Sequence, residues 1–199
     1  MLYPNHGGSV PLTLAALVII GCLHQAAGSS VPSETAQDID LTVPAPRAKK
    51  EQAMSPQKKA EALGIKFEKL KPGYLNWCNR SGKLLFTSGF ASKTNGRLGK
   101  DLTTKQGYEA ARECGIEILR AVWDRHGTLD GLRVIKVLGC VNSAPDFVEQ
   151  PKVINGCSDL LHEVFGAKTD GHHARSALGF ASLPNGAAVE IEAIFEIKD

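Results

Sequence analysis

The sequence has little of what marks a nucleic-acid-binding protein. Its 23 lysines and arginines are balanced by 21 aspartates and glutamates, so the formal net charge is only +2, and no long basic run is present. Aromatic residues make up only 6% of the chain. Because contacts to phosphates dominate nucleic-acid affinity and need clustered cations, this composition argues against nucleic acid as a partner.

Signals for metals and cofactors are also missing. The five cysteines lie far apart, with no C-x-x-C pair and no histidine at zinc-ligand spacing beside them: Cys22, Cys78, Cys114, Cys140 and Cys157. No glycine-rich phosphate-binding loop occurs in the sequence. We therefore expect no metal site and no cofactor. The last four cysteines sit on apolar patterns, which predicts buried free thiols.

The chain also lacks the run of about 20 apolar residues that spans a bilayer as a helix. Its longest apolar stretch, residues 12–23, has the length of the hydrophobic part of an export signal. Residues 1–28 are therefore predicted to be a signal peptide cleaved near Gly28, or a lipoprotein signal that places a lipid on Cys22 and attaches the protein to a membrane. Either signal predicts export to the periplasm or cell envelope.

The segment before this stretch carries no lysine or arginine, which leaves a mis-assigned start or an uncleaved anchor as alternatives. A mis-assigned start would place the protein in the cytoplasm. Residues 29–57 are rich in proline, serine, alanine and charge, a composition that predicts a disordered linker. Residues 58–199 are predicted to form one domain.

The order of elements predicted in this domain is ββαβαββ. Apolar runs and alternations bounded by turn residues predict strands at 74–78, 83–88, 132–141, 175–182 and 189–197. Apolar residues at steps of three and four predict one helix that follows Thr103 and ends at Gly127, and a second that starts near Pro151 and ends at Gly166. The first two strands and the last two strands are predicted to form hairpins.

This order predicts an α+β fold in which two helices cover one face of a mixed sheet. In the last strand the apolar residues Val189, Ile191, Ala193, Phe195 and Ile197 point one way, and Glu190, Glu192 and Glu196 point the other. Leu178 and Ile194 fall on the uncovered face, so a second copy of the chain is expected to cover it.

Several segments of the chain resemble the RidA/YjgF family of small trimeric enamine and imine deaminases. They occur in the family's order and are residues 72–74, 84–89, 107–112, 141–147, 173–176, 183–184 and 189–194. The resemblance implies a chorismate mutase-like fold and a homotrimer. The helices would lie outside and the active sites in clefts between subunits.

The resemblance also implies the role of Arg175, which would hold the carboxylate of a 2-imino acid. A guanidinium stays charged and presents a planar fork, so it can bind a carboxylate through two parallel hydrogen bonds. The pair His172-His173 precedes it along the chain. Because His172 and His173 are adjacent residues of an extended chain, their side chains should point in opposite directions. His162, in the second predicted helix, is expected to be solvated.

The other implied site residues surround the substrate. Glu190 would position or activate the attacking water, which makes it catalytic together with Arg175. Ser88 and Gly89 would line the pocket with a hydroxyl and a backbone N–H. Tyr74 would form the pocket wall, and Asn155 is similar to a pocket asparagine of the family.

Three departures resemble a longer, divergent subgroup of the family. Ala177 stands where active deaminases often carry a cysteine, Phe90 replaces part of a usual Ser-Gly-Gln segment, and residues 148–152 look longer than in a typical member. The implied function is hydrolysis of reactive 2-imino or enamine acids to 2-keto acids and ammonia. The alternative is a non-catalytic trimer that binds small carboxylates. Endoribonuclease activity, a label that some relatives carry, is disfavoured by the near-neutral charge.

Overall fold

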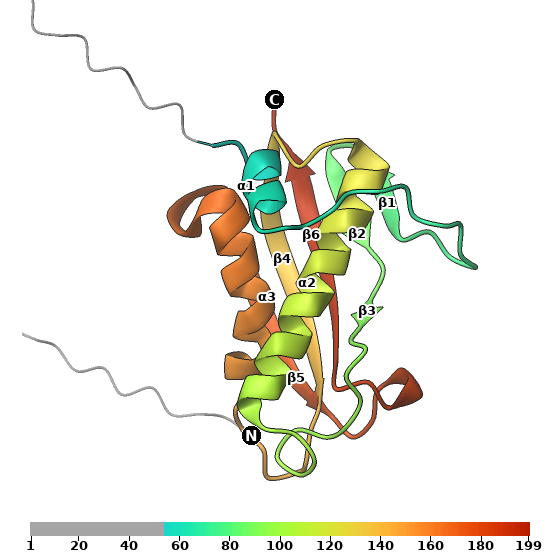
Figure 1. Cartoon of the computed structure of the whole chain (residues 1–199), viewed down its shortest axis with the longest axis vertical. Helices are drawn as coiled ribbons and strands as arrows, with labels where there is room; N and C mark the ends of the chain where they lie inside the picture. The colour runs from blue at the N-terminus through green and yellow to red at the C-terminus, as the bar shows by residue number, and fades with distance from the viewer. Residues whose placement is uncertain (1–53) are drawn as a thin grey trace, which may run out of the picture. The chain divides into compact units, whose positions relative to one another are not determined.

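The computed structural model describes residues 54–199, which form helices packed on one sheet (Figure 1). The strands are β1 (Cys78–Ser81), β2 (Leu84–Thr87), β3 (Phe90–Ala91), β4 (Leu132–Asn142), β5 (Ala174–Phe180) and β6 (Val189–Ile197). The helices are α1 (Pro56–Ala62), α2 (Thr104–His126) and α3 (Gln150–Phe165), followed by a π-helical turn, η1 (Gly166–Asp170), and a 3-10 turn, η2 (Pro184–Gly186).

The predicted signal segment, with Cys22 and Gly28, and most of the predicted linker lie outside the described residues. Helix α1 begins inside the range predicted as linker, because Ser55 caps it and Pro56 occupies its first turn. Within residues 54–199, no helix combines the length and the apolarity needed to cross a membrane.

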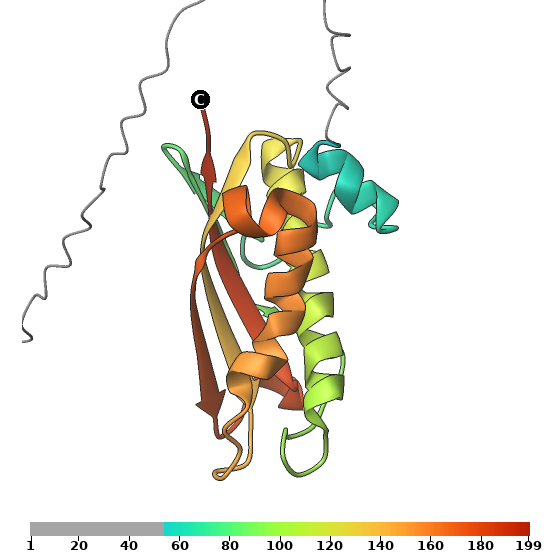
Figure 2. The same cartoon turned by 90° about the vertical axis from the view of Figure 1, so that its left-hand side faces the viewer.

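The sheet is mixed and has the strand order β1-β2-β6-β4-β5, with β3 also paired to β6. β4 and β5 are parallel, and the other pairs are antiparallel. Helices α2 and α3 lie side by side on one face (Figure 2). The predicted α+β fold, with two helices on one face of a mixed sheet, is confirmed.

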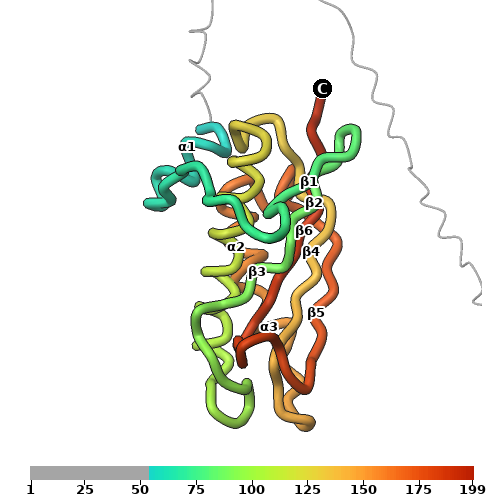
Figure 3. Tube along the Cα trace, turned by 90° about the vertical axis from the view of Figure 1, so that its right-hand side faces the viewer, coloured from blue at the N-terminus to red at the C-terminus, as the bar shows by residue number. Residues whose placement is uncertain are grey.

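The predicted hairpin of the last two strands is wrong, because β4 lies between β5 and β6. The burial of the strands explains the order. β6 buries every second residue from Val189 to Phe195 and suits the middle of a sheet, whereas β5 has no fully buried residue and forms an edge. The trace in Figure 3 shows β5 and β6 on either side of β4.

The first predicted strand is also displaced, since β1 starts at Cys78 and not at Tyr74. Gly82, at a φ of 59°, and Lys83 form the two-residue turn that pairs Ser81 with Leu84. In this register Cys78 already faces Thr87 at the end of β2, so residues 74–77 lie beyond the ladder and form a loop.

The long helix α2 starts and ends where the sequence predicts. Thr103 and Gln106 form a reciprocal capping box at its start, and Gly127 ends it in the left-handed region at a φ of 92°. At its contact with α3, Gly156 lies directly on the backbone of Tyr108. The hydrophobic core fills the space between these two helices and the inner face of the sheet.

The outer face of the sheet carries exposed apolar side chains, and no helix of the described chain covers it (Figure 2). Leu178, Phe180 and Phe86 are 49%, 40% and 39% exposed. Phe86 lies opposite Ile194, and Leu178 lies opposite Cys140. These apolar side chains share the face with Glu190 and Glu192, and side chains of this size suit contact with another protein surface.

The four cysteines of the described chain are free, as predicted. Cys78, Cys114 and Cys157 are buried, whereas Cys140 is only half-buried. Burial raises the pKa of Cys78 to about 11 and the pKa of Cys157 to about 12. These thiols therefore stay protonated at neutral pH and act as small core side chains.

Candidate functional site

Arg175 extends from β5 toward helix α3. Its strand position pairs with the buried Val137 of β4, which places it on the helix-covered side of the sheet. The Nη1 group donates hydrogen bonds to Oδ1 of Asn155 at 2.8 Å and to Oγ of Ser158 at 3.0 Å. Both acceptors are neutral, and Arg175 forms no ion pair within residues 54–199. Its guanidinium therefore has no carboxylate bound to it in this part of the chain.

A surface pocket of about 450 Å³ surrounds Arg175. It is lined by Asn155, Ser158, Asp159, His162, His172, His173 and Arg175. The sequence predicted Arg175 and Asn155 as site residues, whereas the three histidines were named without a place in the site, and Ser158 and Asp159 were missed. A signal for the missed helix residues was present, because positions 155, 158, 159 and 162 are polar and recur at steps of three, one and three. This spacing puts them on one stripe of the helix, beside its apolar stripe.

The histidines of this pocket differ from expectation. His162 is half-buried rather than solvated, with its ring centroid 5.4 Å from that of His173. The prediction that His172 and His173 point to opposite sides is wrong, since both line the pocket. The reason is that both residues precede β5, in the turn that follows Gly171, where the alternation of a strand does not apply.

Both ring nitrogens of His173 are hydrogen-bonded. Nδ1 lies 2.6 Å from the carbonyl oxygen of Gly171, and Nε2 lies 3.1 Å from Oγ of Ser158. Burial lowers the pKa of His173, the hydrogen bond to Gly171 opposes this, and the nearby charges of His162, Arg175 and His172 lower the pKa further. The ring is therefore neutral at neutral pH.

A second group of predicted residues gathers around Glu190 on β6, where Glu190 pairs with Ala91 of β3 and Cys140 of β4. Gly89 lies against its carboxylate, and a Cβ at position 89 would overlap Oε1 of Glu190. Only a residue without a side chain permits this approach. Ser88 is next to it, but its hydroxyl donates to the carbonyl oxygen of Asn76 at 2.7 Å.

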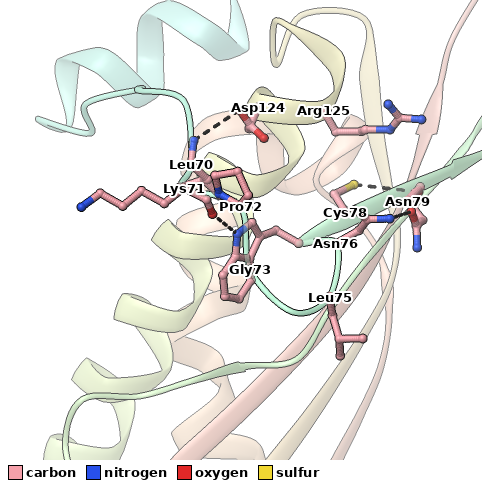
Figure 4. A pocket seen from close by; sticks show the side chains of 11 residues that line it. Leu70, Lys71, Pro72, Gly73, Leu75, Asn76, Cys78, Asn79, Asp124 and Arg125 are labelled. Atoms are coloured by element: carbon pink, nitrogen blue, oxygen red, sulfur yellow. Dashed lines mark hydrogen bonds between the residues drawn. The ribbon is translucent and has the colours of Figure 1, made fainter.

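Tyr74 lies in the loop before β1 and is fully exposed. The loop is closed by Trp77, whose Nε1 donates to the carbonyl oxygen of Lys71 at 3.0 Å and whose ring stacks on Phe90. A hollow of about 390 Å³ lies beside this loop. Among its lining residues, shown in Figure 4, a carboxylate oxygen of Asp124 accepts from the backbone N–H of Leu70. Tyr74 is not among the residues that line the pocket of Arg175.

One chain does not bring Arg175 and Glu190 together. Val137 pairs with Arg175 and Cys140 pairs with Glu190, and these two positions of β4 point to opposite faces of the sheet. The β4 strand also separates the two side chains laterally. The predicted site residues thus form two half-sites, which we call the arginine half-site (Arg175, Asn155) and the glutamate half-site (Ser88, Gly89, Glu190).

Across residues 54–199, no group of three or more histidine, cysteine, aspartate or glutamate side chains is arranged to hold a metal ion. The arginine half-site can instead offer a guanidinium and an amide to an anion, and the glutamate half-site can offer a carboxylate that accepts a proton.

Comparison with known proteins places these half-sites in a family. Residues 71–197 match the family described as Endoribonuclease L-PSP. Protein TCP17 of Trypanosoma cruzi is 40% identical over 148 residues, which cover 70% of this chain and 92% of that protein. Both half-sites lie inside the matched range.

Two solved structures support the same relationship. The protein Atu1372 of Agrobacterium tumefaciens, whose function is unknown, is 38% identical with a TM-score of 0.63, over 72% of this chain and 92% of that one. A candidate endoribonuclease from Shewanella oneidensis is 25% identical with a TM-score of 0.65, over 72% and 99%. The chain therefore belongs to the Endoribonuclease L-PSP family, also called the RidA/YjgF family.

Proposed function

We propose that this protein hydrolyses reactive 2-imino or enamine acids to 2-keto acids and ammonia, in clefts between the subunits of a homotrimer. The observation that carries the proposal is the state of Arg175, which lines a pocket and bonds only to neutral acceptors, Asn155 and Ser158. A guanidinium in that state can accept the carboxylate of a small substrate through two charge-assisted hydrogen bonds, each worth roughly 1.5 to 3 kcal/mol.

The division of the predicted site residues into two half-sites supports an active site that is built from more than one copy of the chain. Arg175 and Glu190 lie on opposite faces of the sheet, so a substrate that touches both must sit between two chains. The exposed apolar side chains of the outer face, Phe86, Leu178 and Phe180, offer a contact surface for such an assembly. A trimer would place the arginine half-site of one copy beside the glutamate half-site of the next.

The proposed reaction adds water across the C=N bond and then releases ammonia. The carboxylate of Glu190 accepts a proton as the oxygen of water bonds to the imine carbon, and the imine nitrogen takes up a proton. The proton taken up by Glu190 replaces the one that the imine nitrogen has gained. In the resulting carbinolamine the hydroxyl proton passes to nitrogen as the C–N bond breaks and the C=O bond forms, which releases ammonia. Since such imines also hydrolyse in water, a thousandfold acceleration would need only about 4 kcal/mol of transition-state stabilisation.

The test is ammonia release from freshly generated 2-iminobutanoate or 2-iminopropanoate by the full chain. We expect Arg175→Ala to lower kcat/KM by about a hundredfold or more, since two charge-assisted bonds are lost. Arg175→Lys keeps the charge but not the planar fork and should recover little of the rate. Equal rates for the wild-type protein and Arg175→Ala would overturn the proposal.

A second candidate is capture of a carboxylate metabolite without turnover, which Ala177 favours because active deaminases of the family often carry a cysteine there. In that case 2-oxobutanoate would raise the melting temperature of the wild-type protein and not of Arg175→Ala, while ammonia release stayed at background.

Cleavage of RNA is a third candidate, favoured by the three histidines that share the pocket of Arg175. Against it, both nitrogens of His173 are already hydrogen-bonded. RNA cleavage that disappears in the double variant His172→Ala/His173→Ala, together with no imine hydrolysis, would select this candidate.

A further inference from the structure

The orientation of the Arg175 guanidinium decides which of its N–H groups can meet a ligand. Both hydrogen bonds that it donates in the described chain come from Nη1. The Nε and Nη2 groups have no partner within residues 54–199, and together they form one edge of the planar fork. That edge matches the two oxygens of a carboxylate. The acceptors of Nη1 therefore determine which edge the arginine presents.

Ser158 is the buried member of this pair of acceptors, with only 5% of its surface exposed. Its hydroxyl has one proton to donate, and this proton cannot point at Nη1, which is itself a donor. The acceptor within reach is Nε2 of His173 at 3.1 Å. Because a buried hydroxyl needs its hydrogen bonds, Ser158 requires His173 to keep Nε2 unprotonated.

The other side of the His173 ring meets that requirement. Nδ1 lies 2.6 Å from the carbonyl oxygen of Gly171, which can only accept, so the single ring proton of a neutral imidazole belongs on Nδ1. All the bonds then run in one consistent direction. Arg175 donates to Ser158, Ser158 donates to His173, and His173 donates to Gly171.

The end of α3 explains why His173 sits there. A Cβ on the buried Gly171 would lie 2.8 Å from the carbonyl oxygens of both Gly166 and Leu161. Glycine thus lets the η1 turn fold tightly against the helix, which places the ring of His173 beside Ser158 and next to His162. His173 is held from both sides rather than left to rotate in solvent.

We propose that Ser158 and His173 are positioning residues, which hold Arg175 so that its Nε and Nη2 edge faces the carboxylate of the ligand. The ligand part of this inference rests on the proposed function, whereas the hydrogen-bond chain itself does not. The titratable and charged groups around His173 are His162 and Asp159 on α3, His172 in the preceding turn, and Arg175 on β5. Neither Ser158 nor His173 needs to touch the reacting atoms.

The first experiment measures the Kd of 2-oxobutanoate by calorimetry, with the full chain. We expect Ser158→Ala and His173→Leu to raise the Kd about tenfold, because the first removes a partner of Arg175 and the second removes the acceptor that orients the Ser158 hydroxyl. His173→Gln keeps a hydrogen-bond acceptor in the side chain and should restore most of the affinity. Ser182→Ala, which removes an exposed hydroxyl after β5, is the matched control and should bind as the wild-type protein does.

A double-mutant cycle shows whether the effect passes through the arginine. In the Arg175→Ala background, Ser158→Ala and His173→Leu should not change the Kd any further. Wild-type affinity in both single variants, or an undiminished additional loss in the Arg175→Ala background, would overturn the inference. Melting temperatures of all variants identify any protein that has failed to fold.

A second measurement needs no ligand. Nitrogen-15 NMR of the histidine rings should find His173 as the neutral tautomer protonated at Nδ1, and Ser158→Ala should alter the side-chain N–H signals of Arg175. A ring protonated at Nε2 would overturn the inference even if carboxylates bind. If the wild-type protein neither binds 2-oxobutanoate nor releases ammonia from 2-iminobutanoate, the proposed function fails, and the NMR measurement alone decides on the hydrogen-bond chain.

Discussion

Gly89 lies so close to Glu190 that a Cβ at position 89 would overlap the carboxylate oxygen Oε1. Gly89→Ala should therefore push the carboxylate away from its position while leaving its charge intact. We expect imine hydrolysis to fall roughly 10- to 100-fold, since displacement of a catalytic group by about 1 Å can cost that much. The measurement is kcat/KM for ammonia release.

The control for this prediction is Glu190→Gln and the double variant. If Gly89→Ala acts by displacing Glu190, the double variant should be no slower than Glu190→Gln alone. If the fold-losses in kcat/KM of Gly89→Ala and Glu190→Gln multiply in the double variant, position 89 acts independently of Glu190.

Gly156 lies in the contact between α2 and α3, where a Cβ would overlap the carbonyl oxygen of Tyr108 and lie 3.0 Å from the backbone nitrogen of Arg112. Because backbone atoms of a helix cannot move aside cheaply, Gly156→Ala should lower the free energy of unfolding by about 3 kcal/mol or more. Urea denaturation measures the change.

Gly115→Ala is the matched control, since Gly115 lies in the same helix contact. Its Cβ would meet side-chain atoms of Leu160 at 3.0 Å and Cys157 at 3.2 Å, which can adjust by rotation. We expect a change within about 1 kcal/mol, because alanine also favours the helix. A larger loss for Gly115→Ala than for Gly156→Ala would contradict this account.

His173 should make stability depend on pH. Burial lowers the pKa of His173 in the folded chain below its ordinary value of about 6.5, so the unfolded chain binds the proton more readily. The contribution of His173 to the free energy of unfolding is complete above pH 6.5. It is lost as the pH falls through the lowered pKa. Denaturation between pH 7.5 and pH 5 should show this loss, and His173→Gln should flatten the curve.

His126 provides the comparison. Its pKa is also lowered, by burial and then by Arg80, so it acts in the same direction. His126→Gln should remove the pH dependence of stability that His126 causes and leave the pH dependence caused by His173 in place. An unchanged pH profile in His173→Gln would show that His173 ionises equally easily in the folded and unfolded chains.

Leu178 is half-exposed on the outer face of the sheet, where we propose that copies of the chain meet. Leu178→Glu should place a charge in that contact and lower the molar mass in light scattering from that of a trimer to that of a monomer. Imine hydrolysis should fall with it, although Leu178 belongs to neither half-site. A monomeric wild-type protein with full activity would refute the intersubunit site.

The sequence predicted correctly those ends of secondary-structure elements that are set by neighbouring residues. The capping pair Thr103 and Gln106 and the terminal Gly127 fix the ends of α2 through contacts within a few residues, and these were predictable. The pairing of β5 with β4 rather than β6 depends on contacts between distant segments, which the alternation of a single strand does not encode.

The same distinction between local signals and contacts of distant segments applies to the site. Arg175 was predicted from the resemblance to the RidA/YjgF family together with the chemistry of a guanidinium, and the structure places it in a pocket. The contact of Ser158 with His173 was not predicted, because it arises from the tight turn at Gly171, whose shape is set by packing against α3. Spacing along the chain carries no sign of that packing.

Helix α1 has a practical consequence for how the protein can be handled. It is fastened to the loop after α2, where the backbone N–H of Gln57 donates to Asp130 and the side chain of Gln57 accepts from the N–H of Leu129. Figure 2 shows α1 on the outer side of the helix layer, remote from the bare face of the sheet. A fluorescent protein or an affinity tag joined ahead of Ser55 would thus be attached on the helix side of the molecule. It would leave the uncovered face of the sheet free to assemble.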